Sequence, residues 1–220
     1  MKAWSYSFIN AYEICPRKLY AERYAKTVKE TKSAAGDYGI EAHKHFENFL
    51  LKDKALPLDL RSHVSVLERL KKASGEGHPE QKLAVNRDFE PTGFFDSDAW
   101  CRGIVDYAKT NPPKAMIIDW KFGRKHDDTR QVRLCAALLM AHMPEVDSIL
   151  AGYYWAKEKD VEQRITRTLV YRLDLPTVWA EFLPLLERID RSEQNDDWPA
   201  KPNFLCRRHC GVTGCEFHGK

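Results

Sequence analysis

Five short segments rich in β-branched and aromatic residues constrain the fold of this chain more than any other feature of its sequence. Turn-forming residues bound each segment, as they bound β-strands. The segments cover residues 80–86, 100–109, 115–120, 149–157 and 164–172. Between the third and fourth, Asp128 to His142 has the apolar spacing of a buried helix. We therefore expect an α/β fold in which a central mixed β-sheet is flanked by helices.

The rest of the chain reads as helical, apart from a cysteine-rich end. Helical spacing predicts helices at about 7–14, 16–25, 35–51, 60–73 and 177–189. Residues 74–79 contain two glycines and a proline and predict a loop. No shift in composition marks a linker, so we expect one domain over 1–220. Its parts are a helical front end (1–75), an α/β core (80–172), and a closing helix with the cysteine tail (173–220).

Composition excludes several classes of protein. The chain is 43% hydrophobic and 30% charged, which is typical of a globular protein with a core. Its longest apolar run, Cys135 to Ala141, is far shorter than the ~18 residues of a membrane span. The first residues lack the apolar stretch of a secretory signal, so we expect a cytoplasmic protein with no membrane partner. A net charge of +3 does not by itself indicate a polyanionic ligand.

Two of the predicted strands carry acids at or near their ends. Asp106 closes the apolar segment that begins at Trp100, and Asp119 follows the run Ala-Met-Ile-Ile with Lys121 two residues later. Asp119 and Lys121 project from the same face of a strand, and Ile118 and Trp120 from the other. If the two strands form a hairpin, Asp106 converges on Asp119 and Lys121.

Two carboxylates and an ammonium on one face suit phosphate chemistry at a divalent cation. Carboxylate oxygens bind Mg²⁺ or Mn²⁺, and such an ion polarises a phosphate and lowers the pKa of a bound water. A lysine nearby can orient the nucleophile or stabilise developing charge. A surface salt bridge between Asp119 and Lys121 is the alternative interpretation.

These residues belong to an ordered set of motifs that resembles a known family. The set comprises Cys15-Pro16-Arg17-Lys18-Leu19-Tyr20, Gly39-Ile40-Glu41-Ala42-His43, Gly103-Ile104-Val105-Asp106, Ile118-Asp119-Trp120-Lys121 and Gln131. It resembles the PD-(D/E)xK nuclease superfamily and, within it, the RecB-like branch of phage recombination exonucleases and CRISPR adaptation nucleases. The resemblance implies a restriction-endonuclease-like core and spans nearly the whole chain.

The resemblance also implies roles for individual residues. His43, Asp106, Asp119 and the main-chain carbonyl of Trp120 would bind Mg²⁺ or Mn²⁺. Lys121 would be catalytic, and Gln131 would position the lysine or the water. Taken alone, without the other motifs, His43 would be interpreted as a buried structural histidine.

Two positions depart from the family pattern. Cys135 stands where the family's Gln-x-x-x-Tyr motif has its tyrosine. Glu80-Gln81-Lys82 imitates the Glu-x-Lys pattern but precedes the Gly-x-x-Asp motif, so we interpret Glu80 as a supporting or structural residue.

The cysteines divide into two groups. Cys101 and Cys135 lie within apolar segments and are expected in the core. Cys206, Cys210 and Cys215 cluster near the end, and Cys15 is the obvious fourth member. Relatives of this type hold a [4Fe–4S] cluster with one N-terminal and three C-terminal cysteines. The spacing of the cysteines here is also compatible with a Zn²⁺ site in which His209 or His218 is the fourth ligand. A third alternative is a tail of reduced cysteines that binds no metal.

Basic and aromatic residues are candidates for DNA contact. Cations bind phosphates and aromatic rings stack on bases. The candidates are Arg17, Lys18, Tyr20, Arg124, Lys125 and Arg130. We expect a metal-dependent DNA exonuclease that acts on linear or single-stranded ends in recombination or end processing, with a recombination protein as a possible partner. The alternatives are a structure-specific endonuclease and a catalytically silent DNA-binding subunit.

Overall fold

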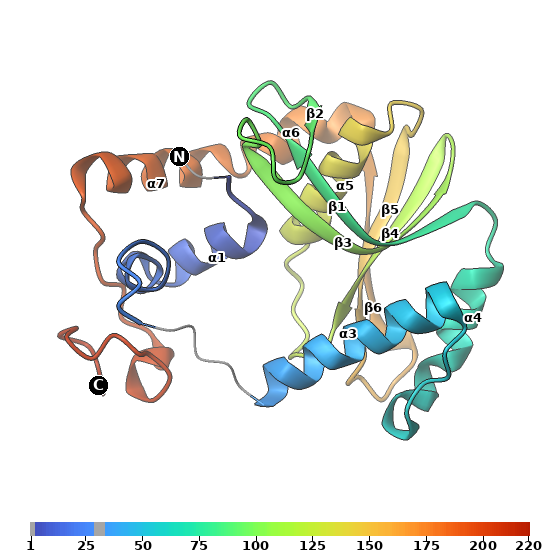
Figure 1. Cartoon of the computed structure of the whole chain (residues 1–220), viewed down its shortest axis with the longest axis horizontal. Coiled ribbons are helices and arrows are strands. Elements are labelled where there is room, and N and C mark those ends of the chain that lie inside the picture. Colours follow the sequence, from blue (N-terminus) through green and yellow to red (C-terminus); the bar gives the residue numbers. More distant parts are fainter. Residues whose placement is uncertain (1–2, 29–33) are drawn as a thin grey trace. The chain divides into compact units, whose positions relative to one another are not determined.

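The computed structural model describes residues 3–28 and 34–220, without the side chains of residues 34 and 35 (Figure 1). The described residues form two compact units. Residues 34–179 make up the first, and both ends of the chain, 3–28 and 180–220, make up the second. The expected organisation as one domain over 1–220 stays a prediction.

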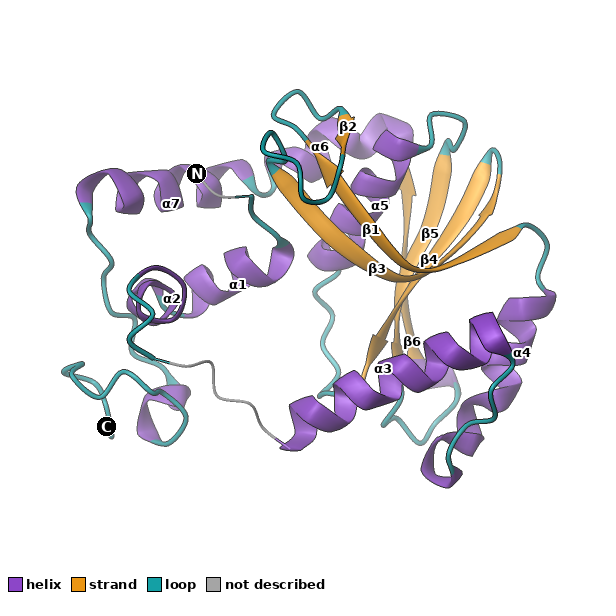
Figure 2. Cartoon of the chain, in the orientation of Figure 1, coloured by secondary structure: helices purple, strands orange, loops and turns teal. Residues whose placement is uncertain are grey.

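The first unit is built on a six-stranded mixed sheet with the order β2-β1-β3-β4-β5-β6 (Figure 2). Its strands are β1 (Glu76–Val85), β2 (Pro91–Thr92), β3 (Cys101–Asn111), β4 (Lys114–Lys121), β5 (Ser148–Trp155) and β6 (Ile165–Tyr171). Strands β4 and β5 are parallel, and every other neighbouring pair is antiparallel. The predicted α/β class with a mixed sheet is confirmed.

Helices cover both faces of this sheet. Helix α5 (Arg130–His142) connects the parallel strands and packs across β1, β3, β4 and β5. Helices α3 (Ala34–Lys52) and α4 (Val64–Lys72), joined through the 3₁₀ helix η2 (Leu58–His63), cover the opposite face. The sheet is therefore sandwiched between two helical layers, as the crossover pattern predicts.

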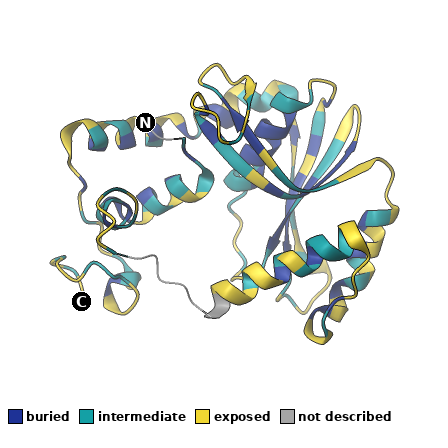
Figure 3. Cartoon of the chain, in the orientation of Figure 1, coloured by how far each residue is buried: buried dark blue, intermediate teal, exposed yellow. Residues whose placement is uncertain are grey.

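Many residues of the sheet and of α5 are buried (Figure 3), and the two faces of the sheet are covered by different side chains. Towards α3 and α4, Phe46 packs edge-on against Trp120 at 5.2 Å between ring centroids, and Leu67 completes the layer. Towards α5, every residue from Leu134 to Met140 is buried. This explains why the sequence of α5 lacks a polar face.

The second unit consists of helices from both ends of the chain. They are α1 (Tyr6–Ile14), α2 (Pro16–Leu19), the π-helix η1 (Tyr20–Tyr24), α7 (Leu183–Asn195) and the 3₁₀ helix η5 (Phe204–Arg207). The Tyr12 hydroxyl lies 2.8 Å from the Ser192 hydroxyl and donates to the Arg188 carbonyl at 3.1 Å. These bonds join α1 to α7 within the unit.

Two of the differences from the sequence-based expectation have a clear physical cause. Strand β1 begins at Glu76, inside the predicted loop, because residues 76–79 pair with residues 107–110 of β3. This long-range pairing overrides the local loop chemistry of Gly77 and Pro79. The single helix expected over 177–189 is two helices, α6 (Leu175–Ala180) and α7. Pro184 in the first turn of α7 has no N–H to continue the preceding helix.

No helix in the described part of the chain is both long and apolar enough to cross a membrane.

Candidate active site

The candidate site lies where strands β3 and β4 separate. Their regular pairing runs from Asn111 and Lys114 to Tyr107 and Ile118, and it stops immediately before Asp106 and Asp119. Beyond that point the Asp106 Oδ2 atom accepts the backbone N–H of Trp120 at 2.8 Å. A side chain thus replaces a ladder hydrogen bond and holds the two strand ends in the splayed arrangement.

Asp119, Lys121 and Gln131 form a connected triad beside this point. Lys121 Nζ lies 2.7 Å from Asp119 Oδ2 and donates to Gln131 Oε1 at 2.8 Å. Gln131 Nε2 donates to Asp119 Oδ1 at 2.7 Å. Lys121 Nζ also lies 5.1 Å from the centre of the Tyr153 ring. The first turn of α5 therefore fixes both the acid and the ammonium.

Asp119 is buried, and its surroundings raise its pKa. Burial raises the pKa of Asp119 to about 6, and the charge of Asp106 acts in the same direction, against the opposing effects of Lys121 and His43. The Asp119 Oδ2 atom is shielded from solvent and has no hydrogen bond of good geometry among the described residues, only the ion pair with Lys121. A buried carboxylate oxygen with unused acceptor capacity is suited to a cation.

His43 reaches the site from α3. Its Nδ1 atom lies 3.3 Å from Asp106 Oδ2, and its ring packs against Phe122 at 5.5 Å. Burial alone would lower the pKa of His43. The hydrogen bond and charge of Asp106, with smaller contributions from Asp119 and the Trp120 backbone, outweigh burial and raise the pKa.

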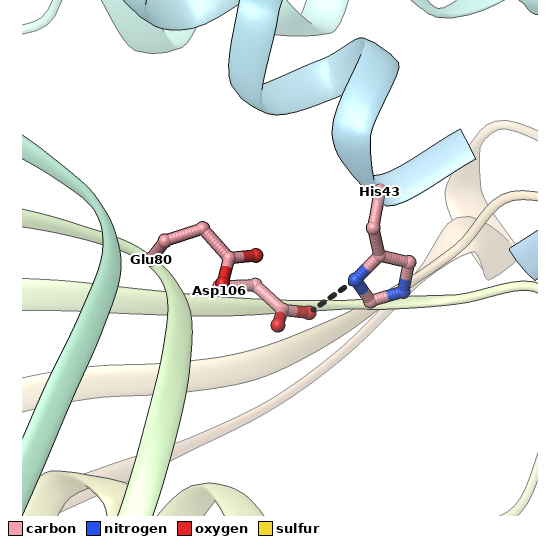
Figure 4. A group of neighbouring side chains, drawn as sticks. All are labelled: His43, Glu80 and Asp106. Atoms are coloured by element: carbon pink, nitrogen blue, oxygen red, sulfur yellow. Dashed lines mark ion pairs between the residues drawn. The ribbon is translucent and has the colours of Figure 1, made fainter. Parts of the chain in front are cut away.

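Glu80 is the residue whose position the sequence did not reveal. Its carboxylate, the His43 ring and the Asp106 carboxylate each offer an atom within 4.8 Å of the other two (Figure 4). Pairing of Pro79 with Tyr107 and of Gln81 with Val105 places Glu80 opposite Asp106. Burial, then the charges of Asp106 and Glu47, raise the pKa of Glu80.

The backbone at Glu80 is unusual for a strand. Its φ of 52° lies in the left-handed region, which costs a non-glycine residue about 1–3 kcal/mol. Such strain clusters at functional sites, where the surrounding structure enforces it. No feature of the local sequence signals this conformation, because the register between β1 and β3 produces it.

The donor set fits a divalent cation. Oxygen ligands of Mg²⁺ lie about 2.0–2.1 Å from the ion, so two on opposite sides stand about 4.2 Å apart. Atoms of His43, Glu80 and Asp106 within 4.8 Å of one another need only small shifts to meet that spacing. The imidazole makes Mn²⁺ somewhat more favourable than an all-oxygen site would.

An open groove of about 930 Å³ leads to these side chains. His43, Asp106, Asp119, Lys121 and Gln131 all line it. Gly39, one helical turn before His43, also lies on its wall. A Cβ atom there would meet only Phe122, at 3.9 Å, so the glycine keeps the approach to His43 open.

The Gly-x-x-Asp motif has a packing reason. A Cβ atom at Gly103 would lie 2.7 Å from Leu138 Cδ1 and 4.0 Å from Cys135 Sγ, so the glycine lets α5 approach β3 closely. Cys135, which replaces the family's tyrosine, is buried in this contact. Burial, with the charges of Asp119 and Asp106, raises the pKa of the Cys135 thiol, which stays protonated.

The predicted DNA-contacting residues fall into both units. Arg124 and Lys125 line the groove, together with Lys157, which the sequence did not single out. Arg130 is engaged with Asp128 at 2.9 Å. In the other unit, Arg17 pairs with Glu216 at 2.6 Å, Lys18 with Glu22 at 3.7 Å, and Tyr20 stacks on Tyr24 at 6.0 Å.

The four tail-associated cysteines lie in the second unit as free thiols. Cys15 and Cys206 are buried, and Cys210 and Cys215 are partly exposed. The backbone N–H of Lys201 donates to Cys15 Sγ, and that of Asn203 to Cys206 Sγ, each at 3.4 Å. In the part of the chain that the structure describes, no three cysteines or histidines of this region meet within 4.8 Å.

Comparisons with known proteins agree with this fold. The model of the PD-(D/E)XK nuclease superfamily matches residues 3–217, and the chain therefore belongs to this superfamily. No curated protein matches the sequence significantly.

Two solved structures share the fold at low sequence identity. SSO0001 is 14% identical, with a TM-score of 0.50 over 99% of this chain and 88% of its own. A candidate exonuclease from Eubacterium rectale is 12% identical, with a TM-score of 0.56 over 94% and 87%.

Proposed function

We propose that this protein is a divalent-metal-dependent DNA exonuclease of the RecB-like branch. The observation that carries the proposal is the convergence of His43, Asp106, Asp119, Lys121 and Gln131 in one open groove. These are the residues that the family motifs assign to catalysis. The resemblance to recombination exonucleases supports action on DNA ends, with a role in recombination or end processing.

Four groups would hold the ion: His43, Asp106, Asp119 and the main-chain carbonyl of Trp120. When bound, Mg²⁺ or Mn²⁺ would polarise the phosphate and supply a water of lowered pKa. Glu80 joins this set as an additional carboxylate, because it offers an oxygen within reach of both His43 and Asp106. The carboxylates of Glu80, Asp106 and Asp119 repel one another, and a cation held between them would offset this repulsion.

Lys121 acts on the reacting phosphate. Its ammonium stabilises the negative charge that develops on the phosphate oxygens, a type of contribution worth about 10²–10³-fold in rate. Gln131 is a positioning residue, because it accepts from Lys121 and donates to Asp119. Arg124 and Lys125, on the groove wall, bind the phosphates that flank the reacting one.

End-labelled linear DNA and covalently closed circular DNA, each incubated with Mn²⁺ or with EDTA, test the proposal. We expect mononucleotides from the linear substrate in Mn²⁺ and no reaction in EDTA. Nicked circles would instead indicate a structure-specific endonuclease. The absence of any metal-dependent product would indicate a silent DNA-binding subunit and overturn the proposal.

We also propose that Cys15, Cys206, Cys210 and Cys215 hold a metal centre in the second unit. Backbone N–H groups that point at the Cys15 and Cys206 sulfurs support it, because such bonds stabilise thiolates. Sulfurs around one zinc ion stand about 3.8 Å apart, given Zn–S distances of about 2.3 Å. Four thiolates satisfy a [4Fe–4S] cluster as well as zinc, so the centre would hold one or the other.

A further inference from the structure

A second cluster lies on the same face of β3 as Asp106, farther from the β3–β4 turn. Side chains alternate along a strand, and the position of Gly103 faces α5, so Arg102, Ile104 and Asp106 share the opposite face. Ile104 lines the groove and is 41% exposed. The groove face of β3 therefore continues from the acid through an apolar residue to an arginine.

Arg102 has no anionic partner in the described part of the chain. Its guanidinium lies 5.4 Å from the centre of the Phe94 ring, and its buried Nε atom has no hydrogen-bond acceptor. An arginine fork offers five N–H donors and is suited to phosphate. A buried donor without an acceptor is costly unless a ligand supplies one.

Phe94 and Phe95 lie on a loop that is held in shape by its own hydrogen bonds. The Thr92 hydroxyl, where the loop begins, donates to Asp98 Oδ1 at 2.8 Å. The Asp96 carboxylate accepts the N–H of Gly93 at 2.9 Å, so it is engaged within the loop. A Cβ atom at Gly93 would lie 2.5 Å from Asp96 Oδ2, which explains the glycine.

The tip of this loop presents an aromatic ring to solvent. Phe95 is 80% exposed, and its ring lies 5.1 Å from that of Phe94 in an edge-on arrangement. An exposed phenylalanine on a preorganised loop, beside an unpaired arginine, provides a stacking surface and a phosphate ligand together.

We propose that Arg102, Phe94 and Phe95 form a subsite for an unpaired segment of the substrate strand. Arg102 binds a phosphate and Phe95 stacks on a base. The proposal rests on the function proposed above, because the position of the subsite along the substrate strand is counted from the reacting phosphate at Asp106. Arg102 and Asp106 are four residues apart on β3, a span of about 13 Å. The subsite therefore lies about two nucleotides of extended strand from the reacting phosphate.

Binding measured without cleavage tests the subsite. The probes are a fluorescent oligo(dT) strand of about 20 nucleotides and a blunt duplex of equal length, both in EDTA. We expect Phe95→Ala to weaken oligo(dT) binding by on the order of tenfold and duplex binding much less. Arg102→Gln should weaken oligo(dT) binding and lower the slope of log affinity against log salt by about 1.

Phe204→Ala is the matched control, because Phe204 is 81% exposed and lies in the other unit. Thermal melting of all three variants verifies folding. If Phe95→Ala and Arg102→Gln bind oligo(dT) with the same affinity as Phe204→Ala, the proposal of this subsite is wrong. Wild-type protein that cleaves neither DNA nor bis(p-nitrophenyl) phosphate in Mn²⁺ overturns the proposed function instead, which separates the two failures.

Discussion

The two candidate centres of this protein differ in how their side chains are held. At the groove, β-strands and helices bring charged groups to within 2.7 to 3.3 Å of one another. In the second unit, Cys210 and Cys215 lie on an irregular tail, and backbone N–H groups donate to the sulfurs of Cys15 and Cys206. Regular structure preorganises the first centre, whereas a bound metal would have to organise the second.

The largest effect is expected at the preorganised centre. Asp119→Ala and Lys121→Ala should each reduce cleavage by about 10²-fold or more, because the first removes a ligand of the metal and the second removes an ammonium at the reacting phosphate. The fold should survive, since without Lys121 the buried Asp119 can take up a proton. Turnover numbers and melting curves are the measurements.

Lys114→Ala is the control for these variants, because Lys114 is exposed at the far end of the same strand. Near-wild-type turnover by purified Asp119→Ala or Lys121→Ala would remove both residues from the site.

The cysteine centre should show the opposite pattern, with stability lost and chemistry kept. Cys15→Ser and Cys210→Ser should release bound iron or zinc and lower the melting temperature by several degrees, at about 2–4 °C per kcal/mol. Nuclease activity per folded molecule should persist, because thiolates are poor ligands for Mg²⁺.

Cys101→Ser and Cys135→Ser are matched controls for metal content, since both thiols are buried in the other unit. Metal analysis and the visible spectrum of anaerobically purified protein provide the readout. Wild-type protein without iron or zinc would refute the centre.

A smaller effect is expected from substitution of His43 or Glu80. His43→Ala and Glu80→Gln should raise the Mn²⁺ concentration for half-maximal cleavage by on the order of tenfold, with the greater loss at limiting metal. Glu76→Gln is the control for Glu80, because Glu76 is exposed on the same strand. If the Mn²⁺ titration of Glu80→Gln matches that of Glu76→Gln, Glu80 is structural.

The smallest effect concerns the pH dependence of stability, through protonation of His63, a buried residue of the first unit that does not line the groove. Burial, then the charge of Arg164, lower the pKa of His63, whose Nδ1 atom lies 2.8 Å from the Tyr154 hydroxyl. Below about pH 6.5 the unfolded chain therefore binds more protons at this position than the folded chain. The free energy of unfolding should therefore decrease as the pH is lowered. Its full contribution is present at higher pH.

Melting curves of wild type and His63→Gln between about pH 7.5 and 5.5 measure this contribution. The variant should be less stable at neutral pH and show a shallower decline towards acid. Parallel declines would assign the pH dependence to other groups.

Much of the fold and the motif-based part of the candidate site could be predicted from the sequence. The residues that converge in the candidate site lie on strands and helices, where the period of the element determines which side chains share a face. Asp119 and Lys121 are an example, since any strand through both presents them together. The crossover helix α5 was predictable for the same reason, because its apolar residues fill the space between parallel strands.

The position of Glu80 in the site could not be predicted from the local sequence pattern. Its place opposite Asp106 depends on the register between β1 and β3, which is decided by pairing over residues far apart in the chain. The left-handed backbone at Glu80 is imposed by that pairing and contradicts local preference. The extension of β1 into a predicted loop has the same origin.

The sequence by itself determined the α/β class, the order of elements and the identity of the motif residues, because these follow from hydrophobic period and spacing. Only the tertiary structure decided which strands neighbour one another, where β3 and β4 separate, and that Glu80 and Arg102 lie on the groove face of the sheet. The physical reason is that hydrophobic period acts over a few residues, whereas strand register and the packing of α5 against Gly103 depend on contacts across the whole unit.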